Sequence, residues 1–258
     1  MHPTVELPDL LRLIDERSTA FRAVVRSAPD LDVPVPSCPG WTLADLAQHI
    51  GAGRRSWAAT VAAGAAATGR VLPDPEEATA PRDRVALDAW LAASTQQLLD
   101  ALAEAGPDRP CWTWWGASQS PQTSGAVARH QLQEVAVHTW DAQLAVGAPQ
   151  PLPPQVALDG VEEFLSTCVA TTSPWPYEPA TVVYRATEGA AWRLGLSAEG
   201  ARAERLAGAD GAWEPDVTGS ATASDLVLLM YGRLPVDVLD IDGDRRPLDG
   251  LVDWEPEA

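Results

Sequence analysis

Two histidines and a glutamate hold the clearest potential for chemistry in this sequence. His130, Glu134 and His138 follow one another at four-residue steps, which places all three on one face if the segment is helical. His49 lies in an earlier segment, seven residues after Thr42, where a second helix is predicted. Two imidazoles and one carboxylate form a suitable three-ligand set for a metal ion with an open coordination position. His49, Glu134 and His138 are therefore candidate metal ligands.

The same spacing permits other interpretations. A glutamate and a histidine four residues apart on a helix commonly form a surface salt bridge or accompany a core histidine. His130 can replace either helical partner, and Asp141, three residues after His138, can orient that imidazole or face solvent. The segment Trp112–Trp115 precedes this helix, and its tryptophans either fill the core or line the mouth of a pocket.

The composition excludes several classes of function. The chain has 258 residues and no lysine, which rules out a Schiff-base lysine, the usual binding of pyridoxal phosphate and a P-loop. A net charge of −18 opposes binding to nucleic acids. The three cysteines lie far apart without a CxxC pair, so neither a disulfide framework nor a thiolate zinc site is predicted.

The sequence shows no targeting signal, and its short glycine motif does not identify a nucleotide-binding site. No stretch approaches the roughly 20 apolar residues of a membrane span, and residues 1–13 lack a secretory signal pattern, so a cytoplasmic protein without membrane partners is expected. The segment Gly51-Ala52-Gly53 begins like a dinucleotide-binding fingerprint, but Ser56 replaces the third glycine and no strand is predicted before it.

The first two-thirds of the chain are predicted to be helical. Apolar residues recur at helical spacing over residues 5–27, 42–63, 83–105, 124–146 and a segment that begins after Pro154. Thr42 is typical of an N-cap, with Asp45 three residues later in an acidic variant of the capping box. Gly64 is expected to end the second helix.

The spacing of apolar residues changes near the segment 173–179, which is predicted to be a linker. Beyond it, three short strands with glycine-containing turns are expected to form a meander, with 213–218 as a possible further strand, a helix over 223–231 and a last strand over 236–241. These elements predict a helical bundle over residues 1–172 and a smaller α+β domain with an antiparallel sheet over 179–258.

Three segments carry a resemblance to a known family. The segment Cys38–His49 resembles the first signature of the mycothiol-dependent maleylpyruvate isomerase family, within the DinB-like superfamily, and Glu134–Ala142 resembles its second signature. The C-terminal region, from Thr218-Gly219-Ser220 through Tyr231–Pro235 to Asp242-Gly243-Asp244, is similar to the small C-terminal domain of that family. Gln133 and His130 depart from the family pattern before the glutamate, where many relatives have histidine and arginine.

The resemblance implies a DinB-like four-helix bundle that holds a divalent metal, usually zinc, through His49, Glu134 and His138. It also implies that Arg233, in the Gly232-Arg233 motif, lies near the active site. There Arg233 either acts on a carboxylate or on developing enolate charge, or pairs with an acidic residue at the interface of the two domains. The implied co-substrate is mycothiol, the low-molecular-weight thiol of actinobacteria. Its thiolate would add reversibly to a cis double bond in an isomerisation, or stay attached to an electrophilic carbon in a transfer.

Two classes of function follow from these observations. The first is a metal- and mycothiol-dependent enzyme, an isomerase or an S-transferase, that acts on a small electrophile as a monomer or homodimer. The second is a noncatalytic metal- or ligand-binding relative, with a regulatory role and the same fold. The retention of all three candidate ligands favours the enzyme, because a purely structural role does not require an open two-histidine, one-carboxylate site.

Overall fold

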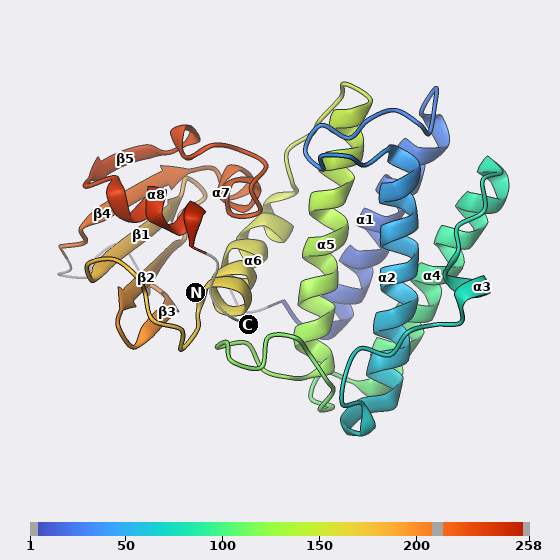
Figure 1. The fold of residues 1–258 in the computed structure, drawn as a ribbon, viewed down its shortest axis with the longest axis horizontal. Coiled ribbons are helices and arrows are strands. Elements are labelled where there is room, and N and C mark those ends of the chain that lie inside the picture. Colours follow the sequence, from blue (N-terminus) through green and yellow to red (C-terminus); the bar gives the residue numbers. More distant parts are fainter. Residues whose placement is uncertain (1–4, 208–213, 255–258) are drawn as a thin grey trace. The chain divides into compact units, whose positions relative to one another are not determined.

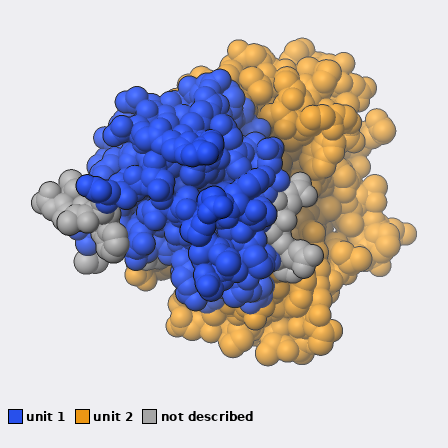
Figure 2. Space-filling model, turned by 60° about the vertical axis from the view of Figure 1, so that its left-hand side comes forward, with its two compact units in different colours: residues 1–4, 115–121, 153–258 blue, residues 5–114, 122–152 orange. Residues whose placement is uncertain are grey.

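The computed structural model describes residues 5–207 and 214–254, and the chain divides into two compact units. The helical unit comprises residues 5–114 and 122–152, and the sheet unit comprises residues 115–121 together with the chain from 153 onward (Figure 2). Each unit has its own buried core, so each is described separately.

The helical unit is built on four long helices that pack as a bundle (Figure 1). Helices α1 and α2 each contact α4 and α5, and a short helix, α3, lies in the loop after α2. The four long helices are confirmed to within about two residues at each end, with these bounds: α1 Leu7–Ser27, α2 Leu43–Ala63, α4 Arg84–Ala105 and α5 Ser124–Ala145. The short helix α3, Pro75–Ala78, was not predicted from the sequence.

The start of α2 is fixed by local hydrogen bonds. The backbone N–H of Asp45 donates to the hydroxyl of Thr42, and the backbone N–H of Thr42 donates to the carboxylate of Asp45, which confirms the predicted capping box. Gly64 follows the last residue of α2 with φ at +58°, a conformation that favours glycine. These two ends set the register in which α2 presents His49.

Gly51 has a packing role that its motif did not indicate. The indole of Trp90 on α4 lies directly against Gly51 on α2, so that a Cβ atom there would approach the ring within 1.9–2.7 Å. A glycine at this point allows the two helices to approach closely around the indole. Gly51 therefore serves helix packing, and the segment is helical with no strand before it.

The sheet unit contains five strands in the order β3-β2-β1-β4-β5 among the described residues. The first three form the predicted antiparallel meander, whereas β4 pairs parallel to β1 and antiparallel to β5. The expected antiparallel sheet is therefore confirmed at three of the four pairings, and the pairing of β4 with β1 is parallel because the chain returns to lie beside β1 in the same direction. The strands are β1 Ala180–Ala186, β2 Ala191–Ser197, β3 Gly200–Arg205, β4 Val217–Ala221 and β5 Asp240–Gly243.

Three helices complete this unit: α6 Pro154–Phe164, which continues into a π-helical turn at Leu165–Val169, α7 Ala223–Met230 and α8 Arg246–Asp253. The predicted strand over 236–241 is wrong at its start. Val236–Val238 forms a single 3₁₀ turn in which the N–H of Val238 donates to the carbonyl of Pro235. Alternating apolar residues there resemble a strand, but local hydrogen bonds replace pairing with a neighbour. Trp213, the start of the possible strand over 213–218, lies outside the described residues.

The segment 173–179, predicted as a linker, lies within the sheet unit. The N–H of Trp175 donates to the carbonyl of Ser197, and the buried indole of Trp175 donates to the carbonyl of Glu178. Helix α6, assigned from the sequence to the bundle, packs against α7 and groups with the sheet unit. Among the described helices, none is long and apolar enough to cross a membrane.

The contrast between Gly51 and Gly53 gives a test of the packing of α2 on α4. Gly51→Ala should lower the free energy of unfolding by about 1–3 kcal/mol, because a methyl group there overlaps the indole of Trp90. Gly53→Ala is the matched control in the same helix, where the nearest atom to a new Cβ lies 3.8 Å away. That change should raise stability by up to about 1 kcal/mol through helix propensity. Urea unfolding followed by circular dichroism measures both, and equal effects would contradict the packing role.

Candidate metal centre

The three candidate ligands meet where α2 faces α5 in the helical unit. The Nε2 atom of His49 lies 3.4 Å from Oε2 of Glu134, and Nε2 of His138 lies 3.6 Å from the same oxygen. One ligand atom from each residue lies within 4.8 Å of the other two. The tertiary structure thus brings together the residues that the sequence singled out, from segments 85 residues apart.

These separations fit a metal ion. Ligand atoms of a tetrahedral zinc site, with bonds of about 2.0–2.1 Å, are separated by roughly 3.3–3.4 Å. The distances from Glu134 to His49 and His138 are close to that value. The side chains of His49, Glu134 and His138 are 39%, 29% and 12% exposed, so the cluster is reachable from solvent on the side of His49. The donor set and its spacing therefore suit a divalent cation.

Asp141 fixes the orientation of His138. Its carboxylate is fully buried, and its Oδ2 atom lies 2.7 Å from Nδ1 of His138. The hydroxyl of Ser37 donates to Oδ1 at 2.6 Å, and the thiol of Cys38 approaches Oδ2 at 3.5 Å. With the proton on Nδ1, the lone pair of Nε2 points toward Glu134, as in metal-binding histidines that are paired with a carboxylate. Of the two interpretations of Asp141, the structure supports the orienting one.

Cys38, His138 and Asp141 form a second group whose potential ligand atoms lie within 4.8 Å of one another. In this group the Asp141 carboxylate is already engaged by short hydrogen bonds to His138 and Ser37. It is therefore better suited to support the first cluster than to hold an ion itself.

Trp41 packs against both histidines of the cluster. Its ring centroid lies 5.0 Å from that of His49 and 6.4 Å from that of His138, and the two imidazole centroids are 5.0 Å apart. Trp41 immediately precedes Thr42, the N-cap of α2, so the capping box also holds this indole near the cluster. The residue thus limits the rotation of both rings.

The carboxyl of Glu134 stays ionised in this environment. Burial by itself raises the pKa of Glu134, but the hydrogen bond from His49 and the charges of the three nearby histidines outweigh burial and lower the pKa to about 2. An ionised carboxylate is the form that binds a metal.

His130 occupies a different place from the other two histidines. Its Nε2 atom lies 3.9 Å from Oε1, the other oxygen of Glu134, and its side chain is 8% exposed. Its ring makes edge contacts with Trp57 and Trp114. His130 is absent from the three-residue groups of converging ligand atoms found among the described residues. The structure therefore places His49 and His138, rather than His130, on the shared oxygen of Glu134.

A cavity of about 240 Å³ adjoins the cluster within the helical unit. His49, His130 and Glu134 line one part of it, and the remaining walls include Arg54, Trp57, Trp112 and Trp114. Both interpretations of the tryptophan segment apply to part of it. Trp112 and Trp114 line the pocket, whereas Trp115 is 1% exposed and belongs to the core. An aromatic cavity beside a candidate metal site suits a small organic ligand.

Arg54 places a buried positive charge in the wall of this cavity. Its guanidinium donates to the hydroxyls of Thr95 and Ser18, each at 2.8 Å, and the residue is 2% exposed. Burial lowers the pKa of Arg54 to about 9, and the negative charge of Glu134 opposes that shift. Sequence reasoning did not identify Arg54 or Ser37, because nothing in their local spacing indicates burial beside the cluster.

Arg233, the residue assigned to catalysis by resemblance, lies in the sheet unit just after α7. Its guanidinium donates to the carbonyl of Tyr231 at 2.6 Å, and the side chain is partly buried. Gly232, which precedes it, has φ at +73°, so the Gly-Arg motif begins with a turn that favours glycine.

The fold and the site define a two-part protein in which a helical bundle brings two imidazoles and a carboxylate together. The sequence model described as the mycothiol maleylpyruvate isomerase N-terminal domain matches residues 11–143, and that of the C-terminal domain of the same enzymes matches residues 155–250. The chain therefore belongs to the mycothiol maleylpyruvate isomerase family. Among curated proteins, no sequence matches it.

Two solved structures share this fold. They are the mycothiol-dependent maleylpyruvate isomerase and a mutant of it in which a histidine is replaced by alanine. Each is 16% identical to this chain, aligns with a TM-score of 0.57, and covers 98% of this chain and 97% of its own length. The predicted fold class, a helical bundle followed by an α+β domain, is confirmed.

The lowered pKa of Glu134 predicts how stability depends on pH in chelator-treated protein. A carboxyl whose pKa falls on folding stabilises the native state above its unfolded pKa of about 4.3, and this contribution disappears as the pH falls toward about 2. The free energy of unfolding of the wild type should therefore exceed that of Glu134→Gln by roughly 1–3 kcal/mol near pH 6. This difference should shrink as the pH falls from about 4.5 to 2. Urea unfolding of both proteins across this range measures it. A difference independent of pH would contradict an ionised, stabilising Glu134.

Proposed function

We propose that this protein is a metal- and mycothiol-dependent enzyme, an isomerase of the maleylpyruvate type or a thiol S-transferase, that acts on a small electrophile. Membership of the family supports the use of mycothiol. The observation that carries the proposal is the convergence of His49 and His138 on one oxygen of Glu134, beside an open cavity.

In this proposal His49, Glu134 and His138 hold one divalent metal ion, most suitably zinc. Bound zinc lowers the pKa of a coordinated thiol, so that a thiolate nucleophile is available near neutral pH without a protein cysteine. Cys111 does not compete for this role, because burial raises the pKa of its thiol.

The residues of the chain supply orientation, shelter and charge. Asp141 keeps the proton of His138 on Nδ1 and leaves Nε2 for the metal. Trp57, Trp112 and Trp114 form apolar walls that can hold the body of the electrophile and exclude water. Arg233 is proposed, by resemblance, to pair with a substrate carboxylate or with developing enolate charge, a role suited to a planar guanidinium.

The second candidate is a noncatalytic binding protein with the same fold. The orienting contacts around His138 favour the enzyme. A buried Asp141, held by Ser37 as well as His138, leaves Nε2 of the imidazole available beside an ionised carboxylate. Passive packing of a histidine does not require this arrangement.

Metal content distinguishes the proposed ligands from their neighbour. His138→Ala should lose most bound zinc, because it removes one of three ligands, whereas His130→Ala should keep about one zinc per chain. The pair is matched, since both histidines are largely buried on α5 and both lie near Glu134. Elemental analysis after dialysis against zinc and removal of free metal gives the result, with circular dichroism to verify folding. Full retention of zinc in His138→Ala would overturn the assignment.

Asp141→Asn provides a graded variant in the same experiment. The amide keeps the size of the side chain but no longer offers two negatively charged oxygens to Ser37 and His138. Zinc affinity should fall by about 10- to 100-fold without complete loss.

The reaction itself is tested with the zinc-loaded protein, mycothiol and maleylpyruvate or another electrophile with a cis double bond or a leaving group. Isomerised product or a mycothiol adduct should appear only when zinc and thiol are both present. If neither forms, and calorimetry shows no binding of mycothiol to the zinc-loaded chain, the noncatalytic alternative replaces the enzyme.

The role of Arg233 is tested under the same conditions. Arg233→Lys should keep zinc and reduce kcat/KM by at least about tenfold, because lysine cannot reproduce the paired hydrogen bonds of a guanidinium. Arg246→Lys is the control, since Arg246 is exposed and pairs with Asp244. Equal activity of both variants would remove Arg233 from the proposed mechanism.

A further inference from the structure

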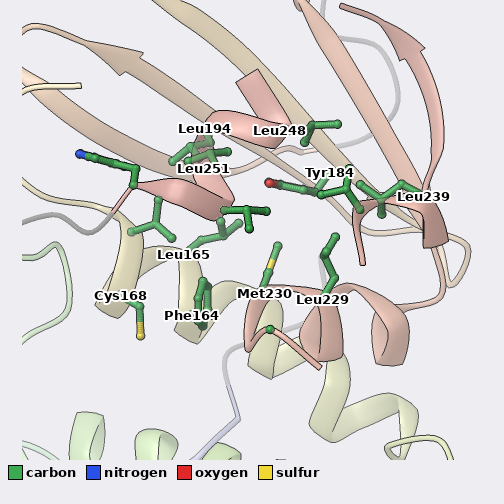
Figure 3. A pocket seen from close by; sticks show the side chains of 15 residues that line it. Phe164, Leu165, Cys168, Tyr184, Leu194, Leu229, Met230, Leu239, Leu248 and Leu251 are labelled. Atoms are coloured by element: carbon green, nitrogen blue, oxygen red, sulfur yellow. The ribbon is translucent and has the colours of Figure 1, made fainter. Parts of the chain in front are cut away.

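The sheet unit contains a cavity of its own, of about 240 Å³ (Figure 3). It lies within one compact unit, and its walls come from the π-helical turn after α6, the face of β1 and β2, and helices α7 and α8. The walls are mainly apolar and include Phe164, Leu194, Leu229, Met230 and Leu248. Nothing in the proposed reaction makes use of this space.

Among the residues that line this cavity, Tyr184 alone carries a hydroxyl group. The side chain of Tyr184 on β1 lines it, and Figure 3 shows its hydroxyl oxygen directed among the apolar side chains. Tyr184 is 6% exposed, and its hydroxyl makes no hydrogen bond with any residue that the structure describes. Buried hydroxyls normally have a partner, because an unpaired one costs free energy. A ligand that accepts a hydrogen bond would provide that partner.

The chemistry of the walls limits the charge of such a ligand. Among the residues that line the cavity, none is an arginine, histidine, aspartate or glutamate. A buried carboxylate or ammonium group would therefore lack a counter-charge, which is strongly unfavourable. Burial also raises the pKa of Tyr184, so its hydroxyl stays protonated and donates at neutral pH. These observations favour an uncharged ligand with a hydrogen-bond acceptor.

The size and the rim of the cavity are consistent with a small organic molecule. An apolar cavity of about 150 Å³ is enough for benzene, so 240 Å³ can hold a molecule on the order of ten non-hydrogen atoms. Val252 of α8 lines the cavity and is 65% exposed, so the wall reaches the surface of the unit there. The wall also includes the π-helical turn, a distortion that often accompanies functional sites.

We propose that this cavity is a second binding site, which takes a small, neutral, largely apolar molecule whose single oxygen accepts a hydrogen bond from Tyr184. The site is independent of the metal centre, because all of its walls belong to the sheet unit and all three metal ligands belong to the helical unit. Medium-chain alcohols and ketones have the required size and polarity.

The test compares 1-octanol with octanoate, which share a chain length and differ in charge. Titration calorimetry on the full chain at pH 8 should give one octanol site per chain, with octanoate at least about tenfold weaker because its charge has no partner. No octanol binding, or equal binding of both molecules, would overturn the proposal.

Two variants locate the site. Tyr184→Phe preserves the shape and should weaken octanol binding by about five- to tenfold, the value of one hydrogen bond. Met230→Trp should abolish binding, because the indole fills the cavity that Met230 lines. Both variants should keep the circular dichroism spectrum and the zinc content of the wild type, which separates this test from that of the metal centre. Unchanged octanol affinity in Tyr184→Phe, or in a folded Met230→Trp, would refute the assignment.

Discussion

The approach of α2 to α5 is the constraint on which the candidate metal centre depends. One carboxylate oxygen on α5 must lie within about 3.5 Å of imidazole nitrogens on both helices, and a shift of either helix by one residue would remove that convergence. The capping box at Thr42 sets where α2 begins, and Gly51 allows α2 to pack closely on Trp90 of α4. Close packing keeps α2 at a fixed position relative to α4 and α5, because protein interiors are dense and deform little.

Buried charge in the helical unit is arranged around Glu134. The carboxylate is surrounded by histidines, Arg54 stabilises it from the cavity wall, and Asp141 places a second negative charge behind His138. Isolated buried charges are costly, and the opposite charges of Glu134 and Arg54 favour the ionised form of each. A divalent cation fits this arrangement, since it would add positive charge where the Glu134 carboxylate and two imidazoles converge, with a second carboxylate behind His138. The same arrangement explains why the surrounding hydroxyls of Ser18, Ser37 and Thr95 are engaged as hydrogen-bond partners.

The two units present cavities of opposite character. The cavity beside the candidate metal centre is lined by charged, imidazole and indole side chains, whereas that of the sheet unit is apolar with one phenolic hydroxyl. Membership of the mycothiol maleylpyruvate isomerase family gives the first cavity a chemical context, and the second has none in the proposed reaction. The two proposals thus assign reaction chemistry and the binding of a neutral apolar molecule to separate compact units.

Local sequence patterns determined the helices, their caps, the β1–β3 meander and the three metal-ligand candidates, because apolar periodicity, capping residues and four-residue spacing act over short distances. Local patterns could not give the parallel pairing of β4 with β1, the 3₁₀ turn at Val236–Val238 or the grouping of α6 with the sheet. They also left His130 equivalent to His138, and Asp141 without an assigned environment. These features depend on which side chains from distant segments come into contact, and only tertiary packing determines those contacts. Packing buries Asp141 against Ser37 and places the indoles of Trp57 and Trp114 against His130.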